Sequence, residues 1–257
     1  MGTSRWWRLF REIDGAAIFS VDLAPHEGHE VEAWGWLDDR ERSRHQRAES
    51  PDARRRFLLC RAALRAVIHR LTGCANDSLR FTAAEQGKPT AQVDGNPVPL
   101  SFSVSHSGRY GLLAVAAGGQ LGVDIEDRAL RRHDPDAVIR AISSPDEQAD
   151  FEQLEDDQRF RLLLRLWTFK EAVAKAQGRG IASARALSRF EIPGEVRRGA
   201  RSSVCRFPQI PDTTWHLEDL STGEFAAAMA HEVSNGPPMV EGRGYSNGHP
   251  GVRGSEL

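Results

Sequence analysis

The sequence predicts an α+β protein whose two halves are similar lobes. Two long segments, Asp52–Leu71 and about Asp157–Gln177, carry apolar residues at helical spacing, and short strand-like segments follow each of them. A length of 257 residues suits one large domain or two small ones. We therefore expect an N-terminal lobe over residues 1–121 and a C-terminal lobe over residues 122–233, although no residue-level repeat relates them.

The N-terminal half contains the first long helix and most of the expected strands. This helix is amphipathic and stops near Gly73, and its apolar positions are Phe57, Leu64, Val67, Ile68 and Leu71. Apolar runs then predict strands at Leu79–Thr82, Leu100–Ser105, Gly111–Ala116 and Gly122–Ile125. Turn-forming residues separate these strands at Asp94–Pro97 and Ala117–Gln120.

The C-terminal half begins with helices. Ser144 and Glu147 have the spacing of a capping box, and Pro145 suits the first helical position, so a helix is expected there before the longer one. The long helix is expected to end at Gly178 and Gly180. Beyond it, the segment Trp215–Ala230 predicts a hairpin whose second strand is rich in alanine.

Composition and charge argue against several classes of protein. The first residues lack the apolar core of a secretory signal, and no window approaches the roughly 18 consecutive apolar residues of a membrane span, so we expect a cytoplasmic protein that binds no membrane. Cys60, Cys74 and Cys205 are odd in number and widely spaced, which predicts neither a disulfide framework nor a zinc site. Residues 234–257 are rich in Gly, Pro and Ser and are expected to form a disordered tail.

The positive charge is unevenly distributed along the chain. The formal net charge of -2 argues against a general attraction to nucleic acid. Between Arg40 and Arg65, however, nine arginines stand against three acids. This local excess predicts an anionic ligand; the alternative is a helix face that simply contacts solvent.

Two acids end a strand that is otherwise apolar. In the stretch GVDIE, Asp124 and Glu126 are two residues apart, so a strand directs both to one face while Val123 and Ile125 point to the other. Paired carboxylates repel each other unless they are protonated or bridged by a cation, and oxygen ligands favour a hard ion such as Mg²⁺. The alternative is a strand that runs out into a polar loop.

A third acid lies on the second long helix. Trp167, Glu171 and Lys175 follow one another at i, i+4 spacing and share a stripe. An exposed Glu to Lys pair needs no function, but lysine occurs in this chain only at Lys88, Lys170 and Lys175, arginine filling every other cationic position. A compact ammonium suits a phosphate oxygen or a proton transfer better than a planar guanidinium does, which favours a functional interpretation of these lysines.

Four blocks of the sequence together resemble the Sfp-type phosphopantetheinyl transferases. In order, they are GKP (Gly87–Pro89), FSVSHSG (Phe102–Gly108), GVDIE (Gly122–Glu126) and WTFKEAVAKAQGRG (Trp167–Gly180). The resemblance implies two α+β lobes around a pseudo-twofold axis with coenzyme A in the cleft between them. It also implies transfer of 4'-phosphopantetheine from coenzyme A to a serine of an apo acyl, peptidyl or polyketide carrier protein, with release of adenosine 3',5'-bisphosphate, by a monomer that serves secondary metabolism.

The resemblance also implies roles for the acidic residues and for the lysine one turn away. Asp124, Glu126 and Glu171 would hold Mg²⁺ on the diphosphate of coenzyme A. Lys175 would lie near the transferred phosphate and stabilise charge or deprotonate the carrier serine. Glu171, directly or through a metal-bound water, is the other candidate base. Trp167 is expected to be structural.

Further positions would bind the nucleotide part of coenzyme A. Ser105 and His106 match the pair that contacts the 3'-phosphate region, and Lys88 matches the lysine of GKP on the nucleotide side. Among the arginines, Arg56 matches the cluster that grips the 3'-phosphate. Less specific matches to that cluster are Arg44, Arg47 and Arg55.

Three other functions fit parts of the pattern. A serine hydrolase would use the Ser-His-Ser cluster, but the G-x-S-x-G elbow is absent because Ser103 occupies the place of its first glycine. A metal-dependent phosphodiesterase or nuclease would use the three acids and a lysine without coenzyme A. A non-catalytic nucleic-acid-binding module would use the arginine-rich helix, although the sequence indicates no aromatic platform beside the arginines.

Overall fold

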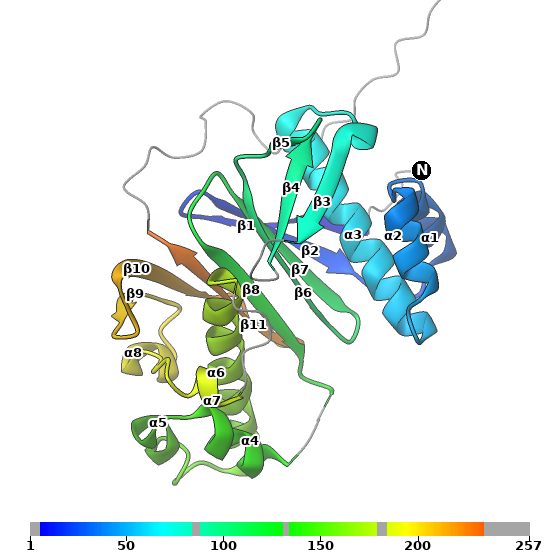
Figure 1. Cartoon of the computed structure of the whole chain (residues 1–257). Helices are drawn as coiled ribbons and strands as arrows, with labels where there is room; N and C mark the ends of the chain where they lie inside the picture. The colour runs from blue at the N-terminus through cyan, green and yellow to red at the C-terminus, as the bar shows by residue number, and fades with distance from the viewer. Residues whose placement is uncertain (1–5, 84–87, 131–133, 179–183, 234–257) are drawn as a thin grey trace, which may run out of the picture.

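The computed structural model describes residues 6–83, 88–130, 134–178 and 184–233, which form a mixed α/β fold with antiparallel sheets (Figure 1). Within these residues, a four-stranded sheet has the order β1-β2-β7-β6 and a second one the order β8-β11-β10-β9, while β3, β4 and β5 make a smaller sheet. The strands are β1 (Trp7–Ile13), β2 (Ala16–Asp22), β3 (Leu79–Ala83), β4 (Pro89–Val93), β5 (Asn96–Pro97), β6 (Ser101–Ser107), β7 (Tyr110–Ala116), β8 (Leu121–Asp127), β9 (Ser202–Phe207), β10 (Ile210–Asp219) and β11 (Phe225–Glu232).

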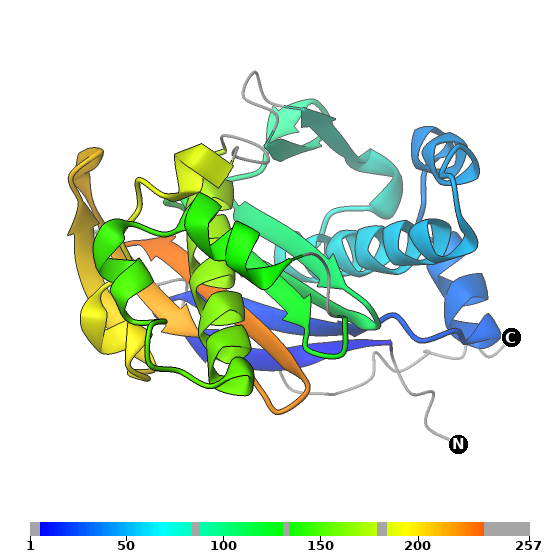
Figure 2. The same ribbon diagram turned by 90° about the horizontal axis from the view of Figure 1, so that it is seen from below.

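Each four-stranded sheet packs against one long helix (Figures 1 and 2). Helix α3 packs on β2 and β7, and helix α6 packs on β8 and β11. The helices, with the short 3₁₀ helix η1, are α1 (Glu27–Trp34), α2 (Asp39–Gln46), α3 (Pro51–Thr72), η1 (Asn76–Ser78), α4 (Pro135–Ile142), α5 (Pro145–Ala149), α6 (Asp156–Ala176), α7 (Ala184–Leu187) and α8 (Gly194–Arg197). No helix in the described segments is both long and apolar enough to cross a membrane.

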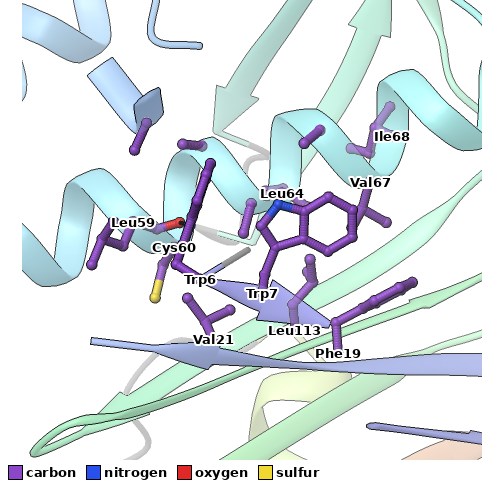
Figure 3. Packing of buried hydrophobic residues seen from close by; sticks show 14 of the residues in the cluster. Trp6, Trp7, Phe19, Val21, Leu59, Cys60, Leu64, Val67, Ile68 and Leu113 are labelled. Atoms are coloured by element: carbon purple, nitrogen blue, oxygen red, sulfur yellow. Dashed lines mark hydrogen bonds between the residues drawn. The ribbon is translucent and has the colours of Figure 1, made fainter. Parts of the chain in front are cut away.

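Three apolar cores join these layers. Alternate residues of β2 and β7 point to opposite faces, so Phe19 and Leu113 pack beneath α3 with Trp7 and Leu64 (Figure 3), while their neighbours face the second sheet. The second core lies between α6 and β10 and β11. The third lies between the two sheets, and its members from β2, β7, β8 and β11 include Ile18, Leu112, Val123, Ile125, Ala227 and Met229. The layers therefore follow the order α3, first sheet, second sheet, α6.

Both long helices agree with their predicted positions to within one residue at each end. Ser50 caps the N-terminus of α3 by accepting a hydrogen bond from the backbone of Ala53, and Gly73 ends the helix with φ of 71°. The capping box of Ser144 and Glu147 opens α5 as predicted. Gly178, just beyond α6, again has a positive φ of 71°, and Gly180 lies outside the described residues.

The first strands were not predicted. Residues Trp7–Ile13 and Ala16–Asp22 form a hairpin whose turn, Asp14 and Gly15, has φ of 46° and 75°. An Asp-Gly pair between apolar segments is a hairpin signal, because both turn residues adopt positive φ, so this element could have been found in the sequence. The predicted disordered tail, residues 234–257, lies outside the described part of the chain.

Candidate functional site

The two acids of β8 face helix α6. Val123 and Ile125 point into the core between the sheets, so the alternation along the strand turns Asp124 and Glu126 toward the helix. Strand and helix approach most closely at Gly122, where a Cβ atom would lie 2.0 Å from the backbone oxygen of Ala172. Only glycine permits this contact, and the contact brings the acids of β8 up to the helix.

Glu171 supplies the third carboxylate from α6. Glu171 is 6% exposed. Burial, together with repulsion from Asp124 and Glu126, raises the pKa of Glu171 to about 7, although the positive charge of Lys175 acts in the opposite direction. Oδ2 of Asp124 is buried and has no hydrogen-bond partner among the described residues. The structure therefore gathers the three predicted acids within electrostatic reach of one another.

Lys175 and Ser105 join the acids. The ammonium of Lys175 donates to Oδ1 of Asp124 at 2.6 Å and to Oγ of Ser105 at 2.8 Å. The hydroxyl of Ser105 in turn donates to the same Asp124 oxygen at 2.8 Å. Ser105 was predicted to contact a phosphate, but in this structure its hydrogen bonds are to the acid cluster.

A cavity of about 700 Å³ connects this cluster to the basic part of the chain. Glu171 and Lys175 lie in its wall, together with residues from α2, α3 and β6. Its lining residues with basic or acidic side chains are Arg44, Arg47, Arg56, Arg61, Lys88, His106, Glu171 and Lys175. The cavity thus combines a strongly cationic wall with Glu171, one of the three carboxylates that the sequence singled out.

The structure distinguishes among the arginines. Arg44, Arg47 and Arg56 line the cavity, as the sequence suggested. Arg55 does not line it, because its Nε donates to the backbone oxygen of Leu23 at 3.0 Å and its guanidinium pairs with Asp52. The three consecutive arginines at 54–56 point in different directions around α3. The sequence alone did not show which of them faces the cavity.

Arg61 lines the cavity and was not predicted. Its guanidinium lies 4.4 Å from the centroid of the Phe81 ring and 5.8 Å from that of Phe57, and Arg44 also lies over Phe57, at 5.1 Å. The sequence indicated no aromatic platform beside the arginines, and the structure does place the rings of Phe57 and Phe81 against them. The i, i+4 spacing of Phe57 and Arg61 was a usable signal.

Lys88 and His106 also lie in the cavity wall. Burial lowers the pKa of Lys88 to about 8, and its ammonium donates to the backbone oxygens of Leu121 at 2.8 Å and Ala176 at 3.3 Å. Lys88 thus connects the beginning of β8 to the end of α6. Desolvation lowers the pKa of His106, with a further contribution from the positive charge of Arg56.

Lys170 does not take part in this site. It is fully buried, and its ammonium binds Glu147 at 2.6 Å and the backbone oxygens of Ile142 and Leu187. The functional interpretation of lysine usage is therefore wrong for Lys170, whose ammonium joins α6 to Ile142, Glu147 and Leu187. Trp167 packs against the second core, as expected of a structural residue.

The acid cluster has suitable donors for a divalent cation. Within the described residues, no group of three or more His, Cys, Asp or Glu side chains is already arranged as a metal cluster. The carboxylates of Asp124, Glu126 and Glu171 nevertheless provide only oxygen ligands, and the unpartnered Oδ2 of Asp124 is a buried acceptor that a cation would satisfy. The donor set therefore fits Mg²⁺.

These features define a class of protein before any comparison is made. A mixed α/β scaffold carries a cavity lined by arginines, Glu171 and Lys175, and Asp124 lies behind that wall, bonded to Lys175. Guanidinium groups recognise phosphate, and grouped carboxylates beside an ammonium suit a metal-assisted reaction of phosphate. The class is a protein that handles a phosphorylated ligand.

Comparison with known proteins identifies the family. Residues 120–230 match the model of the 4'-phosphopantetheinyl transferase superfamily, and residues 24–118 match the model described as 4'-phosphopantetheinyl transferase, N-terminal. The chain therefore belongs to the 4'-phosphopantetheinyl transferase family, a family of transferases.

Individual relatives support this assignment. The chain is 38% identical to protein slr0495 of Synechocystis sp. over 146 residues, 57% of this chain and 58% of that protein. It is 31% identical to the 4'-phosphopantetheinyl transferase HetI of Nostoc sp. over 180 residues, 70% of this chain and 74% of HetI. It is 36% identical to the 4'-phosphopantetheinyl transferase AcpT of Escherichia coli over 97 residues, 37% of this chain and 46% of AcpT.

Proposed function

We propose that this protein transfers the 4'-phosphopantetheine group of coenzyme A to a serine of an apo carrier protein of the acyl, peptidyl or polyketide type. The observation that carries the proposal is that one cavity is lined both by arginines from the α2–α3 region and by Glu171 and Lys175 of α6. Coenzyme A has a separate 3'-phosphate and a diphosphate, and this cavity offers two charged regions that suit them.

In this proposal, the two regions bind the two phosphorylated parts of coenzyme A. Arg44, Arg47 and Arg56 hold the 3'-phosphate together with His106, whose protonation the bound dianion would favour. Lys175 binds the diphosphate. The two helix-covered sheets are then the two lobes of a pseudo-twofold arrangement, with the chain passing from one lobe to the other at Leu121.

The carboxylates would hold the metal ion. Asp124, Glu126 and Glu171 are the residues that would bind Mg²⁺, which when bound neutralises negative charge on the diphosphate. The donation from Lys175 to Asp124 supports this role, because it places a positive group against that carboxylate. The ammonium of Lys175, which lies in the cavity wall, is also within reach of a phosphate bound there.

The transfer exchanges one phosphorus–oxygen bond for another. The serine oxygen of the carrier forms a bond to the phosphorus that bears pantetheine, while the bond from that phosphorus to the bridging oxygen breaks. Adenosine 3',5'-bisphosphate leaves with the electron pair. The serine proton needs an acceptor, and the carboxylate of Glu171, which lies in the cavity wall, is placed to take it directly or through a water. The charged Lys175 stabilises the developing negative charge.

Intact-mass analysis tests the proposal directly. The purified protein is incubated with coenzyme A, MgCl₂ and apo carrier proteins of each class, and at least one carrier should gain the mass of one 4'-phosphopantetheine group. Asp124→Ala and Glu171→Ala should abolish the gain, whereas the control Glu152→Ala, an exposed acid outside the cavity, should not. Absence of any mass gain across all carrier classes, or cleavage of DNA or RNA without coenzyme A, would overturn the proposal.

A further inference from the structure

Three serines alternate along β6, and their hydroxyls all bond to β8. Oγ of Ser103 accepts a hydrogen bond from the backbone nitrogen of Val123 at 3.1 Å. Ser105 donates to Asp124 at 2.8 Å, and Ser107 donates to Oε2 of Glu126 at 2.7 Å. All three serines are buried, at 5 to 7% exposure.

These bonds cross the boundary between the two sheets. Strand β6 ends the order of the first sheet and pairs with β7, whereas β8 ends the order of the second sheet and pairs with β11. Because the serine spacing of two residues equals the spacing of the two acids, Ser105 and Ser107 meet Asp124 and Glu126 in register. The serines that interrupt an otherwise apolar strand therefore determine how the acid pair is held.

The two acids differ in how much support they need. Asp124 has a short side chain, and Oδ1 receives hydrogen bonds from both Ser105 and Lys175. Glu126 has one more rotatable bond and is less buried than Asp124, so orienting its carboxylate costs more side-chain entropy. A hydrogen bond to a charged carboxylate is stronger than one between neutral groups, and the hydroxyl of Ser107 supplies such a bond.

We propose that Ser107 is a positioning residue that orients the Glu126 carboxylate for metal binding. The inference rests on the proposed function, because it assigns Glu126 to the metal. Groups that hydrogen-bond to metal ligands raise metal affinity by fixing the orientation of those ligands, and their removal weakens binding by roughly 10- to 100-fold. Ser107 acts through Glu126 and does not itself touch the substrate.

Ser103 provides a matched comparison for a purely structural role. Its hydroxyl is equally buried and bonds to the same strand, but its partner is the backbone of Val123 and not a carboxylate. If the serines served only to join the sheets, Ser103→Ala and Ser107→Ala would change stability and metal affinity alike. If Ser107 orients Glu126, only Ser107→Ala changes metal affinity.

The experiment measures Mn²⁺ binding by electron paramagnetic resonance on the full chain without coenzyme A. Ser107→Ala should raise the Mn²⁺ dissociation constant about 10- to 100-fold, and Ser107→Thr, which retains the hydroxyl, should restore it. Ser103→Ala should bind Mn²⁺ as the wild type does. In a Glu126→Ala background, Ser107→Ala should cause no further change, because the group through which it acts is gone.

Folding and activity measurements separate the possible failures. Urea unfolding establishes that each variant is folded. If either Ser107→Ala or Ser107→Thr fails to fold, the Mn²⁺ affinity of the other variant is compared with that of the wild type. The role of Ser107 alone is overturned if the wild type transfers phosphopantetheine and binds Mn²⁺ but Ser107→Ala leaves the Mn²⁺ affinity unchanged. It is also overturned if the effects of Ser107→Ala and Glu126→Ala on that affinity add. A wild type that shows neither transfer nor Mn²⁺ binding overturns the proposed function and this inference together.

Discussion

Individual residues in the acid cluster are held by bonds that do not compensate all of their charge. Asp124 receives hydrogen bonds from Lys175 and Ser105 on one oxygen, while its other oxygen has no partner among the described residues. Glu171 lies beside it with a raised pKa, because burial and two neighbouring acids disfavour its charged form. The three acids therefore repel one another when charged, and a cation bound between them would relieve that repulsion.

This repulsion predicts how stability depends on pH. The pKa of Glu171 is about 7 in the folded chain, above the 4.5 of an unperturbed glutamate, so between these pH values the folded state binds more protons than the unfolded state. Without added metal, the free energy of unfolding should therefore fall as pH rises from 5 to 8. In Glu171→Gln this free energy should fall less over the same range, because the titrating carboxyl is gone.

Urea unfolding in the presence of a chelator at both pH values measures this effect. Glu152→Gln, at an exposed acid, is the control and should behave as the wild type. The interpretation is wrong if wild type and Glu171→Gln lose equal stability between pH 5 and pH 8.

At the scale of elements, the close contact of β8 with α6 decides where the acids meet. Gly122 precedes Asp124 by two residues, faces the helix and permits backbone contact with it. Since β8 and α6 carry the three acids between them, their separation controls the distance between the carboxylates. The glycine of GVDIE thus has a packing role that the spacing of the acids alone does not reveal.

Gly122→Ala should disrupt both stability and transfer. The new methyl group would lie 2.0 Å from the oxygen of Ala172 and 2.5 Å from the nitrogen of Ala176, and both are backbone atoms that cannot rotate away. We expect a loss of about 1 to 3 kcal/mol in urea unfolding, with transfer lost because α6 must move away from β8. Gly223→Ala, where the added carbon meets nothing within 4 Å, is the control. Wild-type transfer by Gly122→Ala would contradict this account.

At the scale of the whole molecule, the two sheets share one core. Ile18 and Leu112 of the first sheet pack with Val123 and Met229 of the second, in a cluster separate from those beneath α3 and α6. Neither half can bury its inner sheet face by itself. We therefore predict that the N-terminal and C-terminal lobes do not fold independently.

Dividing the chain at the expected boundary tests this consequence. Fragments 1–121 and 122–257, expressed separately, should expose their inner sheet faces, bind the dye ANS and give poorly dispersed NMR spectra. The intact chain should unfold in one cooperative transition, because the third core joins the inner faces of the two sheets. Two stable, well-dispersed fragments would show that the core between the sheets is dispensable.

Many elements could be predicted because their signals are local. Helix α3 has a serine cap, a proline in its first turn and a glycine at its end, and its boundaries follow from these residues. The acids of β8 could be assigned to one face because strand alternation needs only neighbouring residues. The hairpin β1–β2 was not predicted, although the Asp14–Gly15 pair is a local signal for its turn. The sequence therefore contained the information needed to predict this hairpin.

The sequence by itself determined the long helices, most strands, the family resemblance and the set of candidate acids, since each depends on residues close together in the chain. Only the tertiary structure decided that Arg61 lines the cavity and Arg55 does not, that Lys170 is buried against Glu147, and that Ser107 bonds to Glu126. Such contacts join residues distant in sequence or choose between adjacent positions on a helix. They depend on how sheets and helices pack, which no local pattern records.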